Sequence, residues 1–249
     1  MPIQSTARIA VGDRFKEFLG NDGTVPATAL LDELRSGTLS PTAEIVLGQG
    51  LSGAQLRELR DLTTADVPLP VERHLTHKYD EKNVLIGDVR EDGPDTYVAP
   101  LLLDERVEVL ADHLTGQHIP AVTLLEAARQ TWTVVIEQHV VSGDAPTRFV
   151  IGSIRSAFNS FVFPLPATIE FRLTGHRTSP VGTSVDCELT VRQDGRAAAE
   201  FAVNIRVIPE AVAVKQEAMA ARQAIRSALS GEISGEISGE TKAKAEAGR

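Results

Sequence analysis

The chain has 249 residues, of which 42% are hydrophobic and 24% charged, and this composition is typical of a globular protein with a buried core. Its formal net charge of −9 and its lack of a basic cluster among aromatic residues argue against nucleic acid binding, because such binding depends on phosphate contacts. No apolar run reaches the ~18 to 20 residues of a membrane helix, and the N-terminus lacks the pattern of a secretory signal. We therefore expect a cytoplasmic protein that binds neither nucleic acid nor membrane.

The first 70 residues are predicted to form a helical extension. Three leucines share one side of a helix over residues 27–34. Ser52 followed three residues later by Gln55 is a capping-box pattern before a second helix over residues 54–62. The Val-Pro-Leu-Pro sequence that ends the extension indicates a stiff, extended boundary. Nothing in this extension indicates chemistry.

The pattern changes at Val71. Residues 84–86 and 97–103 are predicted to be strands, separated by the turn-rich sequence EDGPD. The longest helical pattern follows, over residues 120–140, and its apolar residues lie almost all around the helix. A helix that is apolar on nearly every side is buried, so we expect this one to form the centre of the domain.

Strand patterns follow the central helix. Residues 149–154, 158–163 and 168–175 are rich in β-forming residues. Two further segments, residues 185–192 and 199–207, alternate between apolar and polar residues on either side of Asp194-Gly195, which predicts a β-hairpin. Alternation means that each strand has one buried and one solvated face, as in an antiparallel sheet with one face in water.

These elements predict an α+β fold in which a sheet curls around one helix, which is the hot-dog topology, over residues 71–209. Residues 210–249 should begin as a helix, to about Leu229, and end as a low-complexity tail that we expect to be disordered.

Residues 112–130, DHLTGQHIPAVTLLEAARQ, hold most of the candidate functional residues. Two histidines, His113 and His118, precede the helix, and Glu126 lies in its first turns with Arg129 and Gln130 on the same face. The backbone N–H groups of Ala121, Val122 and Thr123, at the helix start, could polarise a thioester carbonyl. An imidazole and a carboxylate nearby could move protons at neutral pH.

The sequence resembles the A-factor biosynthesis hot-dog family of actinomycetes, whose members make the acyl precursor of γ-butyrolactone signals. The resemblance covers roughly residues 71–209 and depends on a small set of short motifs. These are His77-Lys78, Val84-Leu85-Ile86, Asp112-His113, Gln117-His118-Ile119-Pro120 and Leu125-Glu126-Ala127-Ala128-Arg129-Gln130. The chain also resembles, more distantly, the hot-dog β-hydroxyacyl-carrier-protein dehydratases, in which a Gly-His-Phe-Pro motif precedes a helix with Glu-Ala and then Gln.

These resemblances imply that His113 and Glu126 are the catalytic residues. His118, Arg129, Gln130, Lys78 and the helix start over residues 121–123 are the predicted substrate-binding residues. The family's reaction is the transfer of a β-ketoacyl group from a carrier protein to dihydroxyacetone phosphate. The chain has one Asp-His…Glu-Ala-Ala-Arg-Gln block, whereas typical members have two, so the resemblance implies a homodimer with a composite site.

Several alternatives remain at this stage. Thr123 and Glu126 have capping-box spacing, so Glu126 could simply stabilise the helix start. Arg129 could pair with Glu126 instead of a substrate phosphate, and a solvated strand end would explain Lys78 and the neighbouring His77. The same site could also serve dehydration, thioester hydrolysis or mere binding of an acyl thioester.

Metal and cofactor sites are not expected. His113 and His118 lack the spacing of a helix-borne zinc pair, and the sequence offers no third ligand. The single cysteine, Cys187, excludes an internal disulfide. It lies on the apolar face of a predicted strand, so we expect it in the core rather than as a nucleophile.

Overall fold

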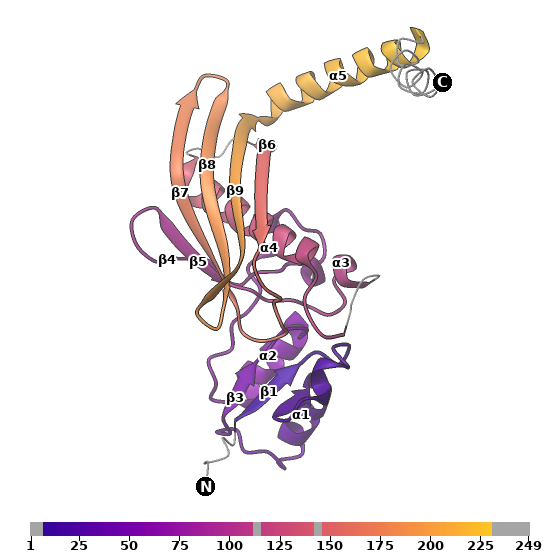
Figure 1. Cartoon of the computed structure of the whole chain (residues 1–249), viewed down its shortest axis with the longest axis vertical. Helices are drawn as coiled ribbons and strands as arrows, with labels where there is room; N and C mark the ends of the chain where they lie inside the picture. The colour runs from indigo at the N-terminus through magenta and orange to yellow at the C-terminus, as the bar shows by residue number, and fades with distance from the viewer. Residues whose placement is uncertain (1–6, 112–115, 142–145, 231–249) are drawn as a thin grey trace, which may run out of the picture.

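The computed structural model describes residues 7–111, 116–141 and 146–230. Its N-terminal part has a three-stranded parallel sheet of β1 (Arg8–Val11), β2 (Thr24–Pro26) and β3 (Ile45–Leu47), in the order β2-β1-β3. Helices α1 (Ala27–Arg35) and α2 (Gly53–Leu62) lie beside it (Figure 1). Both predicted helices are confirmed, and Ser52 and Gln55 form the predicted capping box. The three short strands were not predicted.

The main sheet is antiparallel and has six strands. These are β4 (Arg90–Glu91), β5 (Thr96–Pro100), β6 (Thr147–Phe158), β7 (Thr168–Ser179), β8 (Gly182–Gln193) and β9 (Arg196–Pro209), in the order β4-β5-β7-β8-β9-β6. The predicted hairpin joins β8 to β9. Its turn residues Asp194 and Gly195 both have positive φ, 51° and 71°, which suits the twist of a two-residue hairpin turn.

Two predicted strands are wrong. Residues 84–86 are extended but form only an isolated bridge between Ile86 and Leu101, because the Leu85 amide donates to the side chain of Gln130 instead of to a neighbouring strand. Residues 159–163 form a loop, and the Phe163 amide donates to the side chain of Gln193. In both places a glutamine side chain satisfies a backbone group that a strand would have paired.

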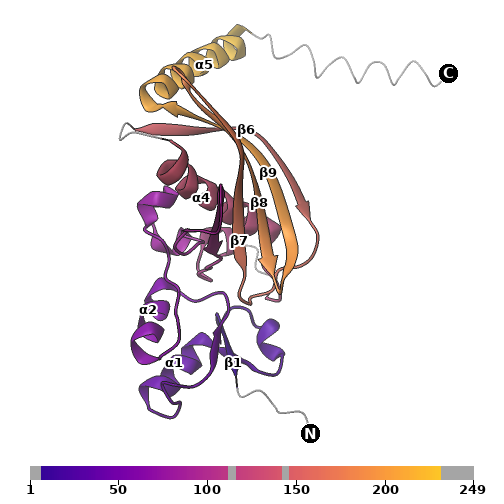
Figure 2. The same ribbon diagram turned by 90° about the vertical axis from the view of Figure 1, so that its left-hand side faces the viewer.

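Helix α4 (Ala121–Val135) crosses the inner face of the curved sheet and continues as a π-helical turn, η4 (Ile136–Val140) (Figure 2). Trp132 of α4, Phe171 of β7 and Phe201 of β9 are buried in the same core. The hot-dog topology predicted from the sequence is thus confirmed. Short helical turns flank the domain: η2 (Arg73–Thr76), η3 (Glu81–Asn83) and α3 (Glu108–Ala111).

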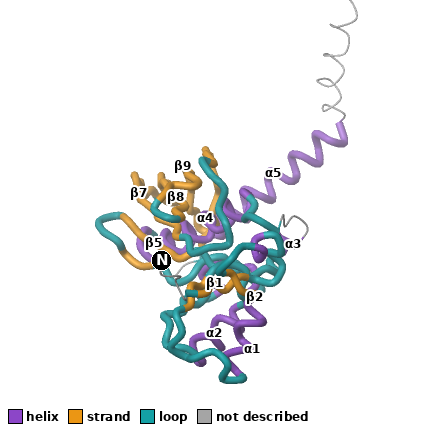
Figure 3. Tube along the Cα trace, turned by 60° about the horizontal axis from the view of Figure 1, so that its bottom comes forward, coloured by secondary structure: helices purple, strands orange, loops and turns teal. Residues whose placement is uncertain are grey.

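The N-terminal part packs against the hot-dog domain through a shared core. Val11, Phe15 and the short helix η1 (Phe18–Gly20) contribute to the cluster that contains α4 and the main sheet. The Phe18 amide donates to the Gly116 carbonyl at 3.0 Å, and the Phe18 ring stacks on Phe163. Helices α1 and α2 lie apart from β7, β8 and β9 (Figure 3). Because Phe18 bonds to Gly116, the N-terminal part contacts the loop that leads into α4.

Helix α5 (Glu210–Ser230) follows β9 and projects away from the sheet (Figures 1 and 2). Its presence confirms the predicted C-terminal helix, while the expected low-complexity tail lies outside the described residues. Over the described part of the chain, no helix is both long enough and apolar enough to cross a lipid bilayer.

Candidate functional site

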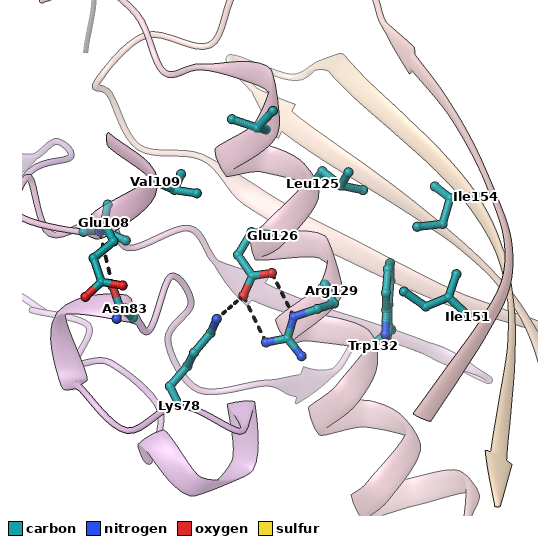
Figure 4. Close-up of a pocket in the computed structure, with 12 residues that line it drawn as sticks. Lys78, Asn83, Glu108, Val109, Leu125, Glu126, Arg129, Trp132, Ile151 and Ile154 are labelled. Carbon is teal, nitrogen blue, oxygen red and sulfur yellow. Dashed lines mark hydrogen bonds and ion pairs between the residues drawn. The ribbon is translucent and has the colours of Figure 1, made fainter. Parts of the chain in front are cut away.

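A pocket of about 430 Å³ lies between α4 and the edge strand β6 (Figure 4). One part of its lining is apolar and the other is polar, so it could hold a molecule with an apolar tail and a charged head. The apolar part consists of Val107, Val109, Val122, Leu125, Trp132, Ile151 and Ile154, and the polar part of Lys78, Asn83, Glu108, Glu126 and Arg129.

Glu126 lies at the centre of the polar contacts of this pocket. Its carboxylate accepts hydrogen bonds from Arg129 Nε at 2.9 Å and Nη2 at 3.0 Å, and Lys78 Nζ lies 2.7 Å from Oε1. Gln130 Nε2 donates to the same oxygen at 3.0 Å. The sequence spacing predicted that these three residues of α4 share a face, but Lys78 comes from a distant turn.

These partners set the charge of Glu126. Burial would raise the pKa of this carboxyl group, but hydrogen bonds from Arg129 and Lys78 outweigh that effect and lower the pKa below its usual value of 4.5. Glu126 is therefore a carboxylate at neutral pH. It can orient a hydrogen-bond donor, but a lowered pKa makes it a weak base, and without a bound proton it is poorly suited to start a reaction as an acid.

The alternative that Glu126 caps the helix is wrong. Helix α4 begins at Ala121 with Pro120 as its N-cap, so Thr123 lies inside the first turn instead of ahead of it. The Thr123 side chain is fully buried, and its hydroxyl has no hydrogen-bond partner among the described residues. A proline at the cap has no side-chain oxygen to accept the first N–H groups of the helix.

Lys78 and His77 lie on a turn that follows η2, and not at the end of a strand as the alternative interpretation expected. His77 adopts the left-handed conformation, with φ of 58°, and its Nε2 lies 2.8 Å from Glu137 Oε1. Arg129 also contacts this turn, since Nη2 donates to the Thr76 carbonyl at 2.9 Å. The turn thus packs on the polar side of α4.

Gln130 is buried behind the carboxylate. Its side-chain oxygen accepts from the Leu85 amide and its nitrogen donates to the Asn83 carbonyl, both at 2.8 Å, in addition to its bond to Glu126. Its two hydrogen bonds to backbone groups join α4 to residues 83–85. This side chain fixes the position of Glu126 from behind.

Two of the other predicted residues line a second hollow, of about 500 Å³, at the start of α4. His118 and Ala121 line it, with the exposed rings of Phe158 and Phe161, and the His118 ring centre lies 4.7 Å from that of Phe161. Val122 lies in the first pocket, one residue further along. His113 lies outside the described residues. The predicted residues are thus distributed on two sides of the first turn of α4.

Comparison with known families identifies the domain. The sequence profile of the A-factor biosynthesis hotdog domain matches residues 61–209. The chain belongs to this family. The match begins inside α2 and ends at the last residue of β9, so it includes every described residue of both hollows.

Solved structures with a similar chain trace include a mutant thioesterase from Pseudomonas aeruginosa, 12% identical, which covers 56% of this chain and 95% of its own with a TM-score of 0.41. A dehydratase heterocomplex from Xenorhabdus doucetiae is 16% identical and covers 59% of this chain and 97% of its own, with a TM-score of 0.45. A search of curated protein sequences gave no match.

The apolar wall of the pocket in this A-factor hotdog domain was missed by sequence reasoning. Leu125, Ile151 and Ile154 have the apolar character of ordinary core residues, and Trp132 also belongs to the core. One signal was available: the strand over residues 149–154 follows the central helix directly, so it had to lie near it. Which of its residues face the pocket depends on register, which the sequence does not show.

The described part of the A-factor hotdog domain contains no group of three His, Cys, Asp or Glu residues that could hold a metal ion. Cys187 is buried on β8, as predicted, and burial raises the pKa of its thiol to about 12. A thiol with such a pKa is protonated at neutral pH and is a poor nucleophile.

Proposed function

We propose that this protein transfers a β-ketoacyl group from a thioester to a hydroxyl acceptor, such as dihydroxyacetone phosphate, in the biosynthesis of a signalling lactone or related specialised metabolite. The observation that supports this proposal is the pocket at α4, where an apolar wall meets the ionised Glu126 and two cations. Membership of the A-factor biosynthesis hotdog family supports the choice of pathway.

In this proposal the acyl chain lies along Leu125, Ile151 and Ile154, and the charged acceptor lies near Lys78. Lys78 suits this role better than Arg129 does, because the guanidinium of Arg129 already donates to Glu126, Thr133 and the Thr76 carbonyl. Arg129 would act indirectly, by holding Glu126 in place. The thioester carbonyl would lie near the backbone N–H groups of Ala121 and Val122 at the helix start, because the Thr123 N–H already donates to the Pro120 carbonyl at 3.0 Å.

The proposed reaction is one acyl transfer. The acceptor hydroxyl oxygen attacks the thioester carbonyl carbon while His113 takes the hydroxyl proton. The carbon–sulfur bond then breaks, His113 returns the proton to the departing sulfur, and the products are an ester and a free thiol. Glu126, as a carboxylate, would orient the acceptor. The thiol would be that of an acyl carrier protein or coenzyme A.

We also propose that the protein works as a homodimer joined along β6. This strand has 12 residues and ends the sheet, with β9 as its only partner strand among the described residues. Val150, Ile151 and Phe158 on it are each more than 40% exposed. A long, apolar, unpaired edge favours pairing with another chain. Light scattering should give twice the mass of the chain; a monomer at micromolar concentration would contradict this proposal.

The direct test is incubation with β-ketoacyl and β-hydroxyacyl thioesters, with and without dihydroxyacetone phosphate, followed by mass spectrometry. We expect an acylated triose phosphate that forms only when the acceptor is present. Loss of one water would instead indicate a dehydratase, and release of a free acid a thioesterase. Binding of the thioester without turnover would indicate a sensor, and each of these three outcomes would replace the proposed reaction.

A further inference from the structure

A polar stripe runs along α4 and η4 on the side that faces the η2 turn. Glu126, Arg129, Thr133 and Glu137 are spaced three and four residues apart, so they follow one face of the helix. Residues 76, 77 and 78 of the turn each contact this stripe. The turn therefore lies along the helix and contacts it at three points. We call residues 76–78 with these three contacts the clasp.

The three attachments differ in kind. The Thr76 carbonyl accepts from Arg129, and Lys78 pairs with Glu126 at the pocket (Figure 4). His77 pairs with Glu137, almost three helical turns away from Glu126, and takes no part in lining the pocket. His77 and Lys78 thus point to opposite ends of the stripe from adjacent positions of the backbone.

The backbone of His77 is in a conformation that needs support. A φ of 58° at a residue with a Cβ atom costs about 1 to 2 kcal/mol compared with the usual conformations. The ring is held by Glu137 on η4 and packs edge-on against Phe149 of β6, with ring centres 5.8 Å apart. These contacts come from two elements, and both favour the unusual turn over a relaxed one.

From this geometry we infer that the His77–Glu137 pair is a positioning device that holds the neighbouring Lys78 against Glu126. A lysine side chain is long and flexible, and fixing it costs rotamer entropy. Anchoring the adjacent residue fixes the point from which the lysine starts, and so limits where its amine can go. The kinetic part of this inference rests on the proposed function, whereas the structural part does not.

The test compares two deletions with two controls in the full chain. Glu137→Ala removes the anchor, and His77→Gly removes the ring while keeping a residue that accepts positive φ. Glu137→Gln keeps the oxygen that accepts a hydrogen bond from His77, so it should retain most of the clasp. His74→Ala alters a histidine of the same turn whose side chain pairs with the exposed Glu72, and it keeps the His74 carbonyl that accepts from the His77 amide.

The first measurement is the rate at which a small amine-acylating reagent modifies Lys78, followed by peptide mass spectrometry. We expect both deletions to raise this rate severalfold and both controls to leave it near the wild-type value. The second is steady-state kinetics, in which both deletions should raise the KM for the acceptor about tenfold with a smaller change in kcat, because Lys78 is the group proposed to bind the charge of the acceptor.

The outcomes separate the clasp from the proposed function. An unchanged Lys78 modification rate in both deletions would overturn the inference, whatever happens to activity. A raised rate with unchanged steady-state kinetics would support the structural part of the inference, that the pair positions Lys78, and would overturn its kinetic part. A raised rate in a protein that turns over no thioester would support the clasp and reject the proposed function.

Discussion

Glu126 receives hydrogen bonds from three side chains, and its charge is therefore part of the structure around it. Removing the charge would leave Lys78 and Arg129, each about one quarter exposed, without their shared counterion. A partly buried cation that loses its partner costs about 1 to 3 kcal/mol. The same change would remove the group that orients the acceptor in the proposed reaction.

We predict that Glu126→Gln lowers turnover by about 100-fold or more, with the fold intact. Acyl transfer assays and circular dichroism would measure the two effects. Glu58→Gln is the matched control, since Glu58 is also paired with an arginine, Arg35, but lies in the N-terminal part of the chain. Wild-type turnover in Glu126→Gln would contradict the assigned role.

The lowered pKa of Glu126 predicts a pH dependence of stability. In the unfolded chain the group titrates near 4.5, and in the folded protein it titrates lower. The stabilisation is complete above pH 4.5 and is lost as the pH falls through the lower, folded-state value, because the unfolded state then binds the proton more readily. The stability difference between wild type and Glu126→Gln should therefore be constant above pH 4.5 and shrink below it, in denaturant titrations at several pH values. A difference that grows on acidification would refute this interpretation.

Cys187 offers a chemical probe of the core. Burial on β8 and a pKa near 12 both protect its thiol from alkylation. We expect the folded protein to resist iodoacetamide at pH 8 and to react stoichiometrically once denaturant unfolds it. Rapid labelling of the native protein would show that this strand opens locally.

The candidate site was predictable where its residues are close in sequence. Glu126, Arg129 and Gln130 lie within about one turn of a helix, so their spacing alone places them together. Lys78 could not be placed by spacing, because its contact with Glu126 depends on how the η2 turn packs against α4. The sequence also could not show that Ala121 and Val122 line different hollows, because this depends on which elements pack against each residue.

At the scale of elements, the turns at the two ends of β8 each contain a glycine, and the two glycines differ in their surroundings. Gly195 and Gly182 both have positive φ, at 71° and 132°. A Cβ at position 195 would meet nothing within 4 Å, whereas one at position 182 would lie 2.4 Å from the Val207 carbonyl oxygen. Position 195 therefore requires glycine only for its backbone conformation, whereas position 182 also has no room for a side chain.

We therefore predict that Gly195→Ala lowers the free energy of unfolding by about 1 to 2 kcal/mol, the cost of a left-handed residue with a side chain. Gly182→Ala should cost clearly more, because β9 must also move. Urea denaturation would rank the two variants, and equal losses would show that the close approach at Gly182 is relieved without cost.

The contrast between long and short strands explains what the pattern could reveal about the fold. The 12 residues of β8 and 14 of β9 contain enough alternations to show which face is buried, and the Asp194-Gly195 turn marks where they meet. Strands β1 to β3 have three or four residues, too few for any periodicity to be visible. Their pairing depends instead on packing against α1 and the hot-dog domain.

At the scale of the whole molecule, the N-terminal part has a hydrophobic cluster of its own around α1 and α2, and it also contributes Val11, Phe15 and Phe18 to the core of the hot-dog domain. Each such side chain contributes about 1.5 to 3 kcal/mol by its burial. We predict that a chain starting at residue 61, where the family match begins, exposes this surface, aggregates and binds a hydrophobic dye.

The control for this truncation is removal of residues 215–249. This deletion removes the part of α5 that projects from the sheet, where residues 215–229 are exposed or half-buried. Its thermal transition should match that of the full chain. If the chain starting at residue 61 instead unfolds cooperatively at the wild-type temperature, the two parts are independent domains.

The hydrogen bond from the Phe18 amide to the Gly116 carbonyl reaches across this boundary. It anchors the entrance of α4 to a stretch of chain that the family profile does not cover. Homologues could therefore keep every residue of the hot-dog domain and still differ in how that entrance is held. Sequence change in the N-terminal segment would then alter how the start of α4 is held without changing the residues of the pocket itself.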